Sequence, residues 1–217
     1  MERLESRARA GGAAHARLVR EPPGVTPTLA AVRYALEDHR ARPETAPEAR
    51  PAAVALILLE GLHGLEALFI RRAERADDPW SGQVALPGGR YEPDDADLLA
   101  TAIREAHEET GVDLSAAERL GALDDLYPRT PTLPPVVVRP FVFALASRPV
   151  LVASAEVQRA FWLPLARFAE PGVRRDLTLT LRGVERTFPA YLVGEEVIWG
   201  MTERILTSFL RVIHVNL

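Results

Sequence analysis

Two short apolar runs joined by a glycine-containing link constrain the fold of this chain more than any other feature. The first run covers residues 54–59 (VALILL) and the second covers residues 67–70 (ALFI), with the sequence GLHG between them. Short apolar runs separated by turn residues are typical of buried strands that pair as a hairpin. A third run, residues 84–86, ends at the sequence PGG (87–89), which we expect to form a turn.

Three segments with apolar residues at helical spacing lie around these strands. We expect one helix over residues 28–41, a second over residues 95–110 that stops at Gly111, and a third over residues 195–214. Further strands are expected over residues 121–126 and 136–145, and a second hairpin over residues 178–193.

These elements predict an α/β (α+β) fold in which a mixed β-sheet is sandwiched between α-helices, because the apolar faces of a sheet must be covered. The length of 217 residues suits one domain with an appendage. Residues 1–26 contain several Gly and Pro residues and few large apolar side chains. We therefore expect a weakly structured extension over residues 1–26, followed by one domain over residues 27–217.

The composition excludes several classes of protein. All 26 basic residues are arginine, so no lysine forms a Schiff base or a P-loop, and the absence of cysteine excludes disulfides and a thiol nucleophile. With 30 acidic residues the net charge is −4, without the basic excess usual for nucleic-acid binding. No apolar run approaches the ~18–20 residues of a membrane helix, and the N-terminus lacks the apolar segment of a leader. We expect a cytoplasmic protein with no nucleic-acid or membrane partner.

The residues that carry chemistry lie in the segment 88–112, GGRYEPDDADLLATAIREAHEETGV. On a helix, Glu105, Glu108 and Glu109 fall on one arc beside the apolar stripe. Such a cluster alone is more often a solvated helix face than a site, but three carboxylates this close repel each other unless a cation lies among them. Mg²⁺ takes oxygen ligands and is commonly shared between carboxylates and substrate phosphates. The arc therefore predicts a divalent-cation site for an anionic substrate, with Arg104 orienting one glutamate.

The joint spacing of these residues resembles the Nudix box, GX5EX7REUXEEXGU, in which U is apolar. Gly89 stands at the leading glycine, and the interval from Gly89 to Arg104 is one residue longer than the pattern, so Asp95 aligns with the first acid. The second half of the pattern is matched in order by Arg104, Glu105, Glu108, Glu109, Gly111 and Val112.

The longer interval, the upstream segment 68–89 (LFIRRAERADDPWSGQVALPGG) and the terminal IWGMTERIL are similar to the coenzyme A pyrophosphatase branch of the Nudix hydrolases. This resemblance implies a Nudix fold and hydrolysis of a diphosphate with Mg²⁺ or Mn²⁺. It implies that Glu105, Glu108 and Glu109 bind the metal together with the backbone of Gly89 or Gly88, and that Arg104 completes the catalytic set by positioning a glutamate.

Substrate recognition and the general base stay open at this point. Arginine suits phosphates and tryptophan can stack on adenine, although surface exposure or packing is the plainer interpretation for each side chain. The candidates for substrate binding are Arg72, Arg90, Gly88 and Trp80. The candidates for the general base are Glu105 and Glu109 in the box, and Asp124, Asp125 and Glu156 outside it.

Three functions are compatible with the resemblance. The leading one is cleavage of coenzyme A or its derivatives to 3′,5′-ADP and (acyl-)phosphopantetheine. The second is the same chemistry on another nucleoside diphosphate derivative, such as a dinucleotide, a nucleotide sugar or a nucleoside triphosphate. The third is a non-catalytic binding module, which the intact REAHEETG sequence (104–111) argues against. The expected partner is a small-molecule diphosphate, and the resemblance allows a homodimer.

Overall fold

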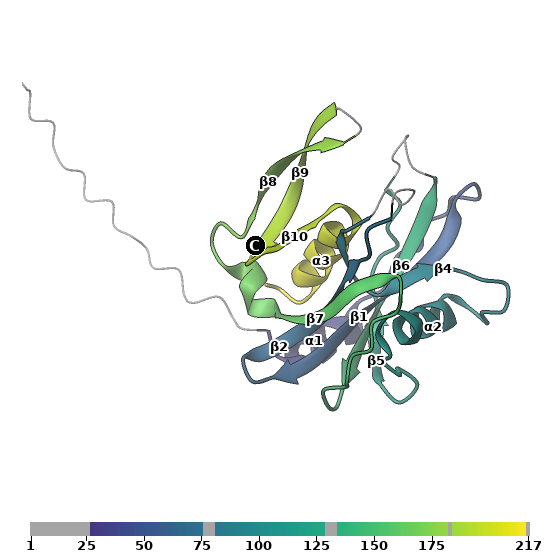
Figure 1. Cartoon of the computed structure of the whole chain (residues 1–217). Coiled ribbons are helices and arrows are strands. Elements are labelled where there is room, and N and C mark those ends of the chain that lie inside the picture. The colour runs from purple at the N-terminus through teal and green to yellow at the C-terminus, as the bar shows by residue number, and fades with distance from the viewer. Residues whose placement is uncertain (1–26, 76–80, 129–133, 182–183, 216–217) are drawn as a thin grey trace, which may run out of the picture.

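A computed structural model of the chain describes residues 27–75, 81–128, 134–181 and 184–215 (Figure 1). The expected extension, residues 1–26, lies outside the described residues. The helices are α1 (Leu29–Asp38), α2 (Leu98–Thr110) and α3 (Gly200–Val212), with a short 3₁₀ helix η1 (Leu165–Ala169). The strands are β1 (Arg50–Gly61), β2 (Gly64–Arg72), β3 (Val84–Ala85), β4 (Gly88–Arg90), β5 (Glu118–Ala122), β6 (Val136–Leu145), β7 (Val157–Pro164), β8 (Arg174–Leu181), β9 (Val184–Val193) and β10 (Glu196–Trp199).

The larger sheet is built around β1, which pairs with strands on both of its edges. Along the order β3–β2–β1–β6–β5, strands β1 and β6 run parallel, with Leu59 opposite Leu145, and the other pairs are antiparallel. Strand β4 also pairs with β1, and β7 pairs with β2, both antiparallel. The sheet is therefore mixed, which confirms the expectation from the sequence.

The hairpin expected from the two apolar runs is confirmed as β1 and β2, which pair around Gly61 and Gly64. Residues 55–59 and 65–70 are buried, since helices or other strands cover both faces of this part of the sheet. The expected turn at residues 87–89 is wrong for the two glycines, because they begin strand β4 and pair with β1. This pairing draws the glycine segment into the sheet instead of leaving it at the surface.

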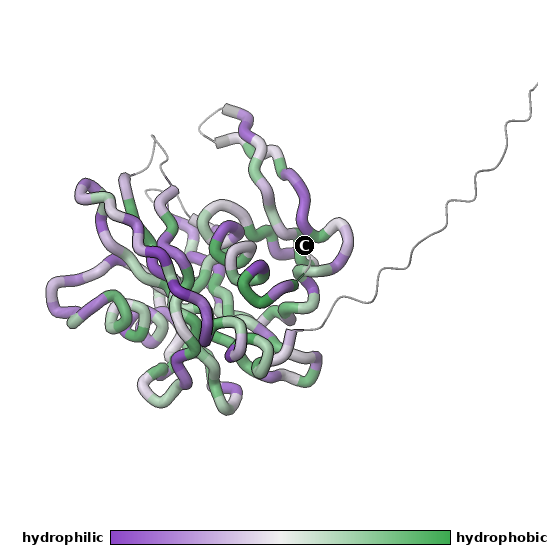
Figure 2. The backbone as a smooth tube through the Cα atoms, turned by 180° about the vertical axis from the view of Figure 1, so that it is seen from behind, coloured by the Kyte–Doolittle hydropathy of each residue, from purple (hydrophilic) through white to green (hydrophobic). Residues whose placement is uncertain are grey.

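Helices cover both faces of the larger sheet. Helix α2 packs through Ala106 on the face that carries Ala55 and Ile57 of β1, whereas α1 and α3 pack on the opposite face against Leu56 and Leu58. Successive residues of a strand point to opposite faces, so one apolar strand supplies both layers of the core. Figure 2 shows hydrophobic and hydrophilic residues alternating along the helices and strands. The predicted mixed sheet between helices is thus present.

The first two helices are present with shorter bounds than expected. Helix α1 is capped by Thr28, whose hydroxyl accepts the Ala31 N–H at 3.2 Å. Helix α2 begins three residues later than expected, because Asp97 caps it by accepting the Ala100 N–H at 2.8 Å. It ends as predicted at Gly111, which adopts the left-handed conformation with a φ of 71°.

The C-terminal part of the chain forms a second sheet in the order β10–β9–β8. The expected second hairpin is confirmed, although its first strand begins already at Arg174; Figure 1 shows it extending away from the larger sheet. The expected C-terminal helix begins only at Gly200, because residues 196–199 form β10. The buried carboxylate of Glu196 ties the two sheets together through ion pairs with Arg71 and Arg159.

We expect Leu56→Ala to lower the free energy of unfolding by about 2–5 kcal/mol, because the Leu56 side chain is fully buried and its removal leaves a cavity. Urea denaturation followed by circular dichroism measures the change. Leu62→Ala is the matched control, since Leu62 is 98% exposed at the β1–β2 turn, and it should change stability by less than about 0.5 kcal/mol. Equal losses in both variants would contradict the assignment of the core.

Candidate active site

The polar side of helix α2 lies next to strand β4, which is paired with β1. Ala106 is fully buried toward the sheet, and Glu105, Glu108 and Glu109 follow the adjacent side of the helix, as the spacing predicts. Their side chains are 16%, 57% and 5% exposed, respectively. The solvent exposure of the three carboxylates therefore differs, with Glu108 in solvent and Glu109 inside the protein.

The guanidinium group of Arg104 organises this arc. Its Nε and Nη2 donate to the two carboxylate oxygens of Asp95 at 2.9 and 3.0 Å. Its Nη1 donates to Glu105 at 3.0 Å and to Glu108 at 3.1 Å, and Nη2 also donates to the Arg90 carbonyl at 3.1 Å. Forked ion pairs of this kind are strong and directional. Arg104 therefore holds helix α2, strand β4 and the loop between them in one arrangement.

Asp95, which aligns with the first acid of the box, serves this arrangement from the loop. It is only 7% exposed, and its Oδ2 also accepts the Glu92 N–H at 3.0 Å and the Thr101 hydroxyl at 2.8 Å. The hydrogen bonds from Arg104 hold the pKa of Asp95 well below its usual range. Arg104 thus positions the two glutamates while Asp95 positions Arg104, a pairing that the sequence pattern did not indicate.

Glu109 is the most deeply buried acid of the arc. Its Oε2 accepts the Gly88 N–H at 2.8 Å, and its Oε1 lies 4.0 Å from Nη1 of Arg72. Burial is the main reason that the pKa of Glu109 rises from 4.5 to about 7, and the neighbouring carboxylate of Glu105 adds to this effect. The Gly88 hydrogen bond and Arg72 act in the opposite direction. Glu109 is therefore a desolvated carboxyl that gains from any further positive charge.

The two glycines of β4 allow the strand to lie against both β1 and α2. A Cβ atom on Gly89 would overlap the Glu105 carboxylate, and one on Gly88 would overlap the Ala53 carbonyl oxygen. Gly88 also has a φ of 153°. Since only glycine fits this close approach, the backbone of β4 reaches the acidic arc directly.

The described residues contain no group of three His, Asp or Glu side chains that is arranged to hold a metal ion. The three expected ligands share one side of α2, but Arg104 holds the carboxylates of Glu105 and Glu108, whereas that of Glu109 points at the Gly88 N–H. Their chemistry still suits a hard divalent cation, because all three offer carboxylate oxygens and Glu109 is desolvated. The expected ligand set is thus present in kind, without being assembled around one point.

The expected substrate-binding residues have different surroundings. Arg72 lies against the arc through its contact with Glu109. Gly88 donates its N–H to the same carboxylate. Arg90 is exposed, and its backbone carbonyl rather than its guanidinium takes part in the site. Trp80 lies outside the described residues.

The structure distinguishes the three candidate bases outside the box. Asp124 accepts a hydrogen bond from Nε of Arg42 at 2.8 Å, and Asp125 accepts one from Nε of Arg139 at 2.7 Å, so both carboxylates are held by arginines. Glu156 is also paired with an arginine, Arg75, but it alone of the three lies near enough to Glu109 to contribute to the raised pKa of Glu109. No local motif marks Glu156, because its position depends on the loop after β6 returning along the end of α2.

That returning loop is fastened to the last turn of α2 by backbone hydrogen bonds. The Val152 N–H donates to the Thr110 carbonyl at 2.8 Å, and the Ser154 N–H donates to the Glu109 carbonyl at 3.3 Å. Glu156 follows at once, and its carboxylate accepts a hydrogen bond from Arg75 at 3.0 Å. The loop therefore brings an exposed carboxylate, 56% accessible, to the buried end of the arc.

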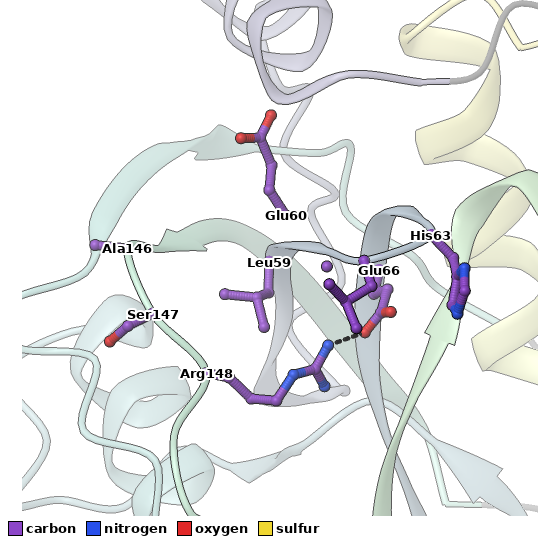
Figure 3. Close-up of a pocket in the computed structure, with 9 residues that line it drawn as sticks. Leu59, Glu60, His63, Glu66, Ala146, Ser147 and Arg148 are labelled. Carbon is purple, nitrogen blue, oxygen red and sulfur yellow. Dashed lines mark hydrogen bonds and ion pairs between the residues drawn. The ribbon is translucent and has the colours of Figure 1, made fainter.

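A separate cavity of about 460 Å³ lies at the opposite end of the larger sheet, between the β1–β2 turn and the segment after β6 (Figure 3). Gly61, which lines it, is eight positions along β1 from Ala53 beside the acidic arc, a span of roughly 26 Å along a strand. Figure 3 shows the buried Glu66 turned toward Arg148, with which it is ion-paired. This charge is already neutralised, so we place the candidate site at α2 and β4.

Comparison with known proteins agrees with the motif. The NUDIX domain family model matches residues 49–182, more than half of the sequence. The chain therefore belongs to the Nudix family, and hydrolysis of phosphorus-containing anhydrides is the activity of this class.

Several curated proteins are similar to this chain over most of its length. A human protein named mitochondrial coenzyme A diphosphatase NUDT8 is 33% identical over 166 residues, which cover 74% of this chain and 69% of that protein. The mouse protein of the same name is 32% identical, covering 80% of this chain and 81% of that protein. The Nudix hydrolase NudL of Photorhabdus laumondii is 32% identical, covering 62% of this chain and 71% of that protein.

A solved structure supports the fold assignment. The MutT/nudix family protein from Enterococcus faecalis superimposes with a TM-score of 0.54 at 22% sequence identity, covering 86% of this chain and 70% of that chain. Separately, none of the helices in the described part of the chain combines the length and apolar character needed to span a bilayer.

The raised pKa of Glu109 predicts a pH-dependent stability in the absence of metal. The folded state holds its proton up to about pH 7 and the unfolded state only to about pH 4.5, so stability falls as pH rises between these values, by roughly 3 kcal/mol at most. In EDTA, wild type should therefore lose stability relative to Glu109→Gln across this range, measured by urea denaturation at several pH values. Glu108→Gln, which removes an exposed carboxylate from the same arc, is the control. Because Glu108→Gln keeps Glu109, its stability should change with pH in parallel with that of wild type. If wild type lost as much stability relative to Glu108→Gln as it loses relative to Glu109→Gln, burial would not be the cause.

Proposed function

We propose that this Nudix hydrolase cleaves the diphosphate of coenzyme A or its derivatives, releasing 3′,5′-ADP and (acyl-)phosphopantetheine. The observation that carries the proposal is the similarity to two proteins named coenzyme A diphosphatase over 74% and 80% of this chain. The longer box with Asp95 at its first acid agrees with that branch. The alternative substrates, which are dinucleotides, nucleotide sugars and nucleoside triphosphates, require the same site chemistry and are separated by experiment.

The site suits a diphosphate only if its negative charge is balanced. Glu105, Glu108 and Glu109, with the backbone of Gly88 or Gly89, would hold Mg²⁺ or Mn²⁺, and such an ion supplies charge neutralisation and an acidified water. A bound cation would stabilise the ionised form of Glu109, because ionisation of its buried carboxyl is costly without a nearby positive charge. Arg72, beside Glu109, adds a fixed positive charge for a substrate phosphate.

Glu156 is our candidate for the general base. The Glu156 carboxylate lies near Glu109 but, at 56% exposure, faces solvent, so it can accept a proton from an attacking water and pass it on. Arg75 holds it through a 3.0 Å hydrogen bond. Arg104 and Asp95 contribute by keeping helix α2 and strand β4 aligned, and touch no reacting atom in this scheme.

The cytoplasmic location and the homodimer remain predictions. The human and mouse relatives are named mitochondrial proteins, so fractionation of the source cells is the relevant test of location. A non-catalytic binding module also remains an alternative, which measured turnover would remove.

Purified protein supplied with Mg²⁺ or Mn²⁺ should convert coenzyme A to 3′,5′-ADP and phosphopantetheine, resolved by liquid chromatography and mass spectrometry. Activity should be absent in EDTA and return on addition of either metal, because the acidic arc repels an uncompensated diphosphate. A panel of ADP-ribose, a diadenosine polyphosphate, a nucleotide sugar and ATP serves as comparison. Hydrolysis of one of these with coenzyme A left intact would exclude the proposed substrate, and binding without any turnover would favour the module.

Glu156→Gln should lower kcat by about 10²–10⁴-fold with little change in KM, because the amide cannot accept the proton. Glu170→Gln is the matched control: Glu170 is 47% exposed and paired with Arg167 at 3.1 Å, much as Glu156 is paired with Arg75. The control should retain the kcat and KM of wild type. An unchanged kcat in Glu156→Gln would return the role of base to Glu105 or Glu109.

A further inference from the structure

A second cavity, of about 190 Å³, is lined by residues of helix α3, of strand β6 and of the segment that follows β5. These residues include Pro140 of β6, Asp124 and Asp125 after β5, and Arg204 and Ser208 of α3. The Nudix-box residues contribute nothing to its wall. It therefore lies on the face of the larger sheet that is opposite to α2.

The pairing of the strands fixes how far this cavity lies from the acidic arc. Gly88 of β4 is opposite Val54 of β1, and Val54 is opposite Pro140 of β6, so the three residues form one row across the sheet. Two strand spacings separate Gly88 from Pro140, which is about 10 Å. Val54, midway along the row, is only partly buried on the α3 face. A ligand at Gly88 can thus extend across β1 and reach the cavity.

The charges around the cavity leave one arginine uncompensated. Asp124 accepts the backbone N–H of Arg42 at 2.9 Å as well as its guanidinium. Asp125 accepts two hydrogen bonds from the Arg139 guanidinium, both at 2.7 Å. Within the described part of the chain, Arg204 has no hydrogen bond or ion pair, and it is exposed. The cavity wall therefore offers a guanidinium group that is available to an external anion.

Ser208 adds a hydroxyl donor beside this guanidinium. Residues four apart on a helix lie on the same side, about one turn from each other, and both line the cavity. A guanidinium fork with a neighbouring hydroxyl is a suitable set of donors for a phosphate. The acceptor side chains of the lining, Asp124 and Asp125, are already hydrogen-bonded to Arg42 and Arg139.

We propose that Arg204 and Ser208 bind the 3′-phosphate of coenzyme A and so determine the preference of the enzyme for this substrate. The inference rests on the proposed function, because it concerns the same substrate. In coenzyme A the 3′-phosphate and the 5′-diphosphate are attached to one ribose, which suits two anion sites about 10 Å apart along the row from Gly88 through Val54 to Pro140. Arg204 contacts a phosphate that does not react, so it determines specificity and takes no part in the chemical step.

The test compares kcat/KM for coenzyme A and for 3′-dephospho-coenzyme A in the full chain with Mg²⁺ or Mn²⁺. Wild type should prefer coenzyme A, and Arg204→Gln should reduce that preference about tenfold to a hundredfold, mainly through KM, which is the usual worth of a charge-assisted hydrogen bond. Arg204→Lys should restore part of it. Arg211→Gln, two turns further along α3 and away from the cavity lining, is the matched control and should keep the preference of wild type.

A binding measurement gives a second readout that does not depend on turnover. By isothermal titration calorimetry, 3′,5′-ADP should bind wild type more tightly than 5′-AMP does, and Arg204→Gln should remove the difference. An equal loss for both nucleotides would overturn the inference in favour of contact with the base or ribose. Cleavage of coenzyme A with no preference over the dephospho form would overturn the inference alone, whereas failure to cleave either compound would overturn the proposed function as well.

Discussion

The ion pair between Arg104 and Asp95 is the interaction on which the candidate site depends. Nε and Nη2 of Arg104 donate hydrogen bonds to Asp95. The Arg104 guanidinium also donates hydrogen bonds to Glu105, Glu108 and the Arg90 carbonyl. A loop, a strand and a helix thereby meet at one planar cation. The hydrogen bonds from Arg104 lower the pKa of Asp95, which favours the ionised carboxylate that this ion pair requires.

The packing of β4 decides how the acids are distributed around that ion pair. Because Gly88 and Gly89 carry no side chains, β4 lies directly between β1 and α2, and Glu109 is covered. Glu108, one residue earlier, points to solvent. A single helix thus presents an exposed carboxylate and a desolvated one side by side. Such a pair is unfavourable without a counter-charge, which is the physical reason to expect a cation and a polyanionic ligand here.

The two faces of the larger sheet carry different charged groups. The face under α2 carries the carboxylates and the returning loop with Glu156. The face under α3 carries a cavity whose two acids are engaged by arginines and whose remaining charge is positive. The row from Gly88 through Val54 to Pro140 connects them. The row thereby joins the acidic arc to the cavity wall with Arg204, where we propose that a phosphate binds.

Much of the fold and part of the site could be predicted from local sequence. The apolar runs of β1 and β2, the cap Thr28, the terminating Gly111 and the arc of three glutamates are encoded by residues a few positions apart, where periodicity and capping chemistry operate. The box motif added the family, and the family model over residues 49–182 agrees with it. The bounds of α3 and the strand at Gly88 could not be predicted, because both depend on pairing with distant strands.

The sequence by itself determined which acids share one side of a helix, since that follows from 3.6 residues per turn. Only the tertiary structure decided that Asp95 faces Arg104 and that Glu109 is buried while Glu108 is not. It also decided that Glu156 lies near Glu109 and that Arg204 lines the cavity beside Pro140. These outcomes join residues from 9 to more than 100 positions apart. They depend on how the sheet brings its strands together, which no local pattern records.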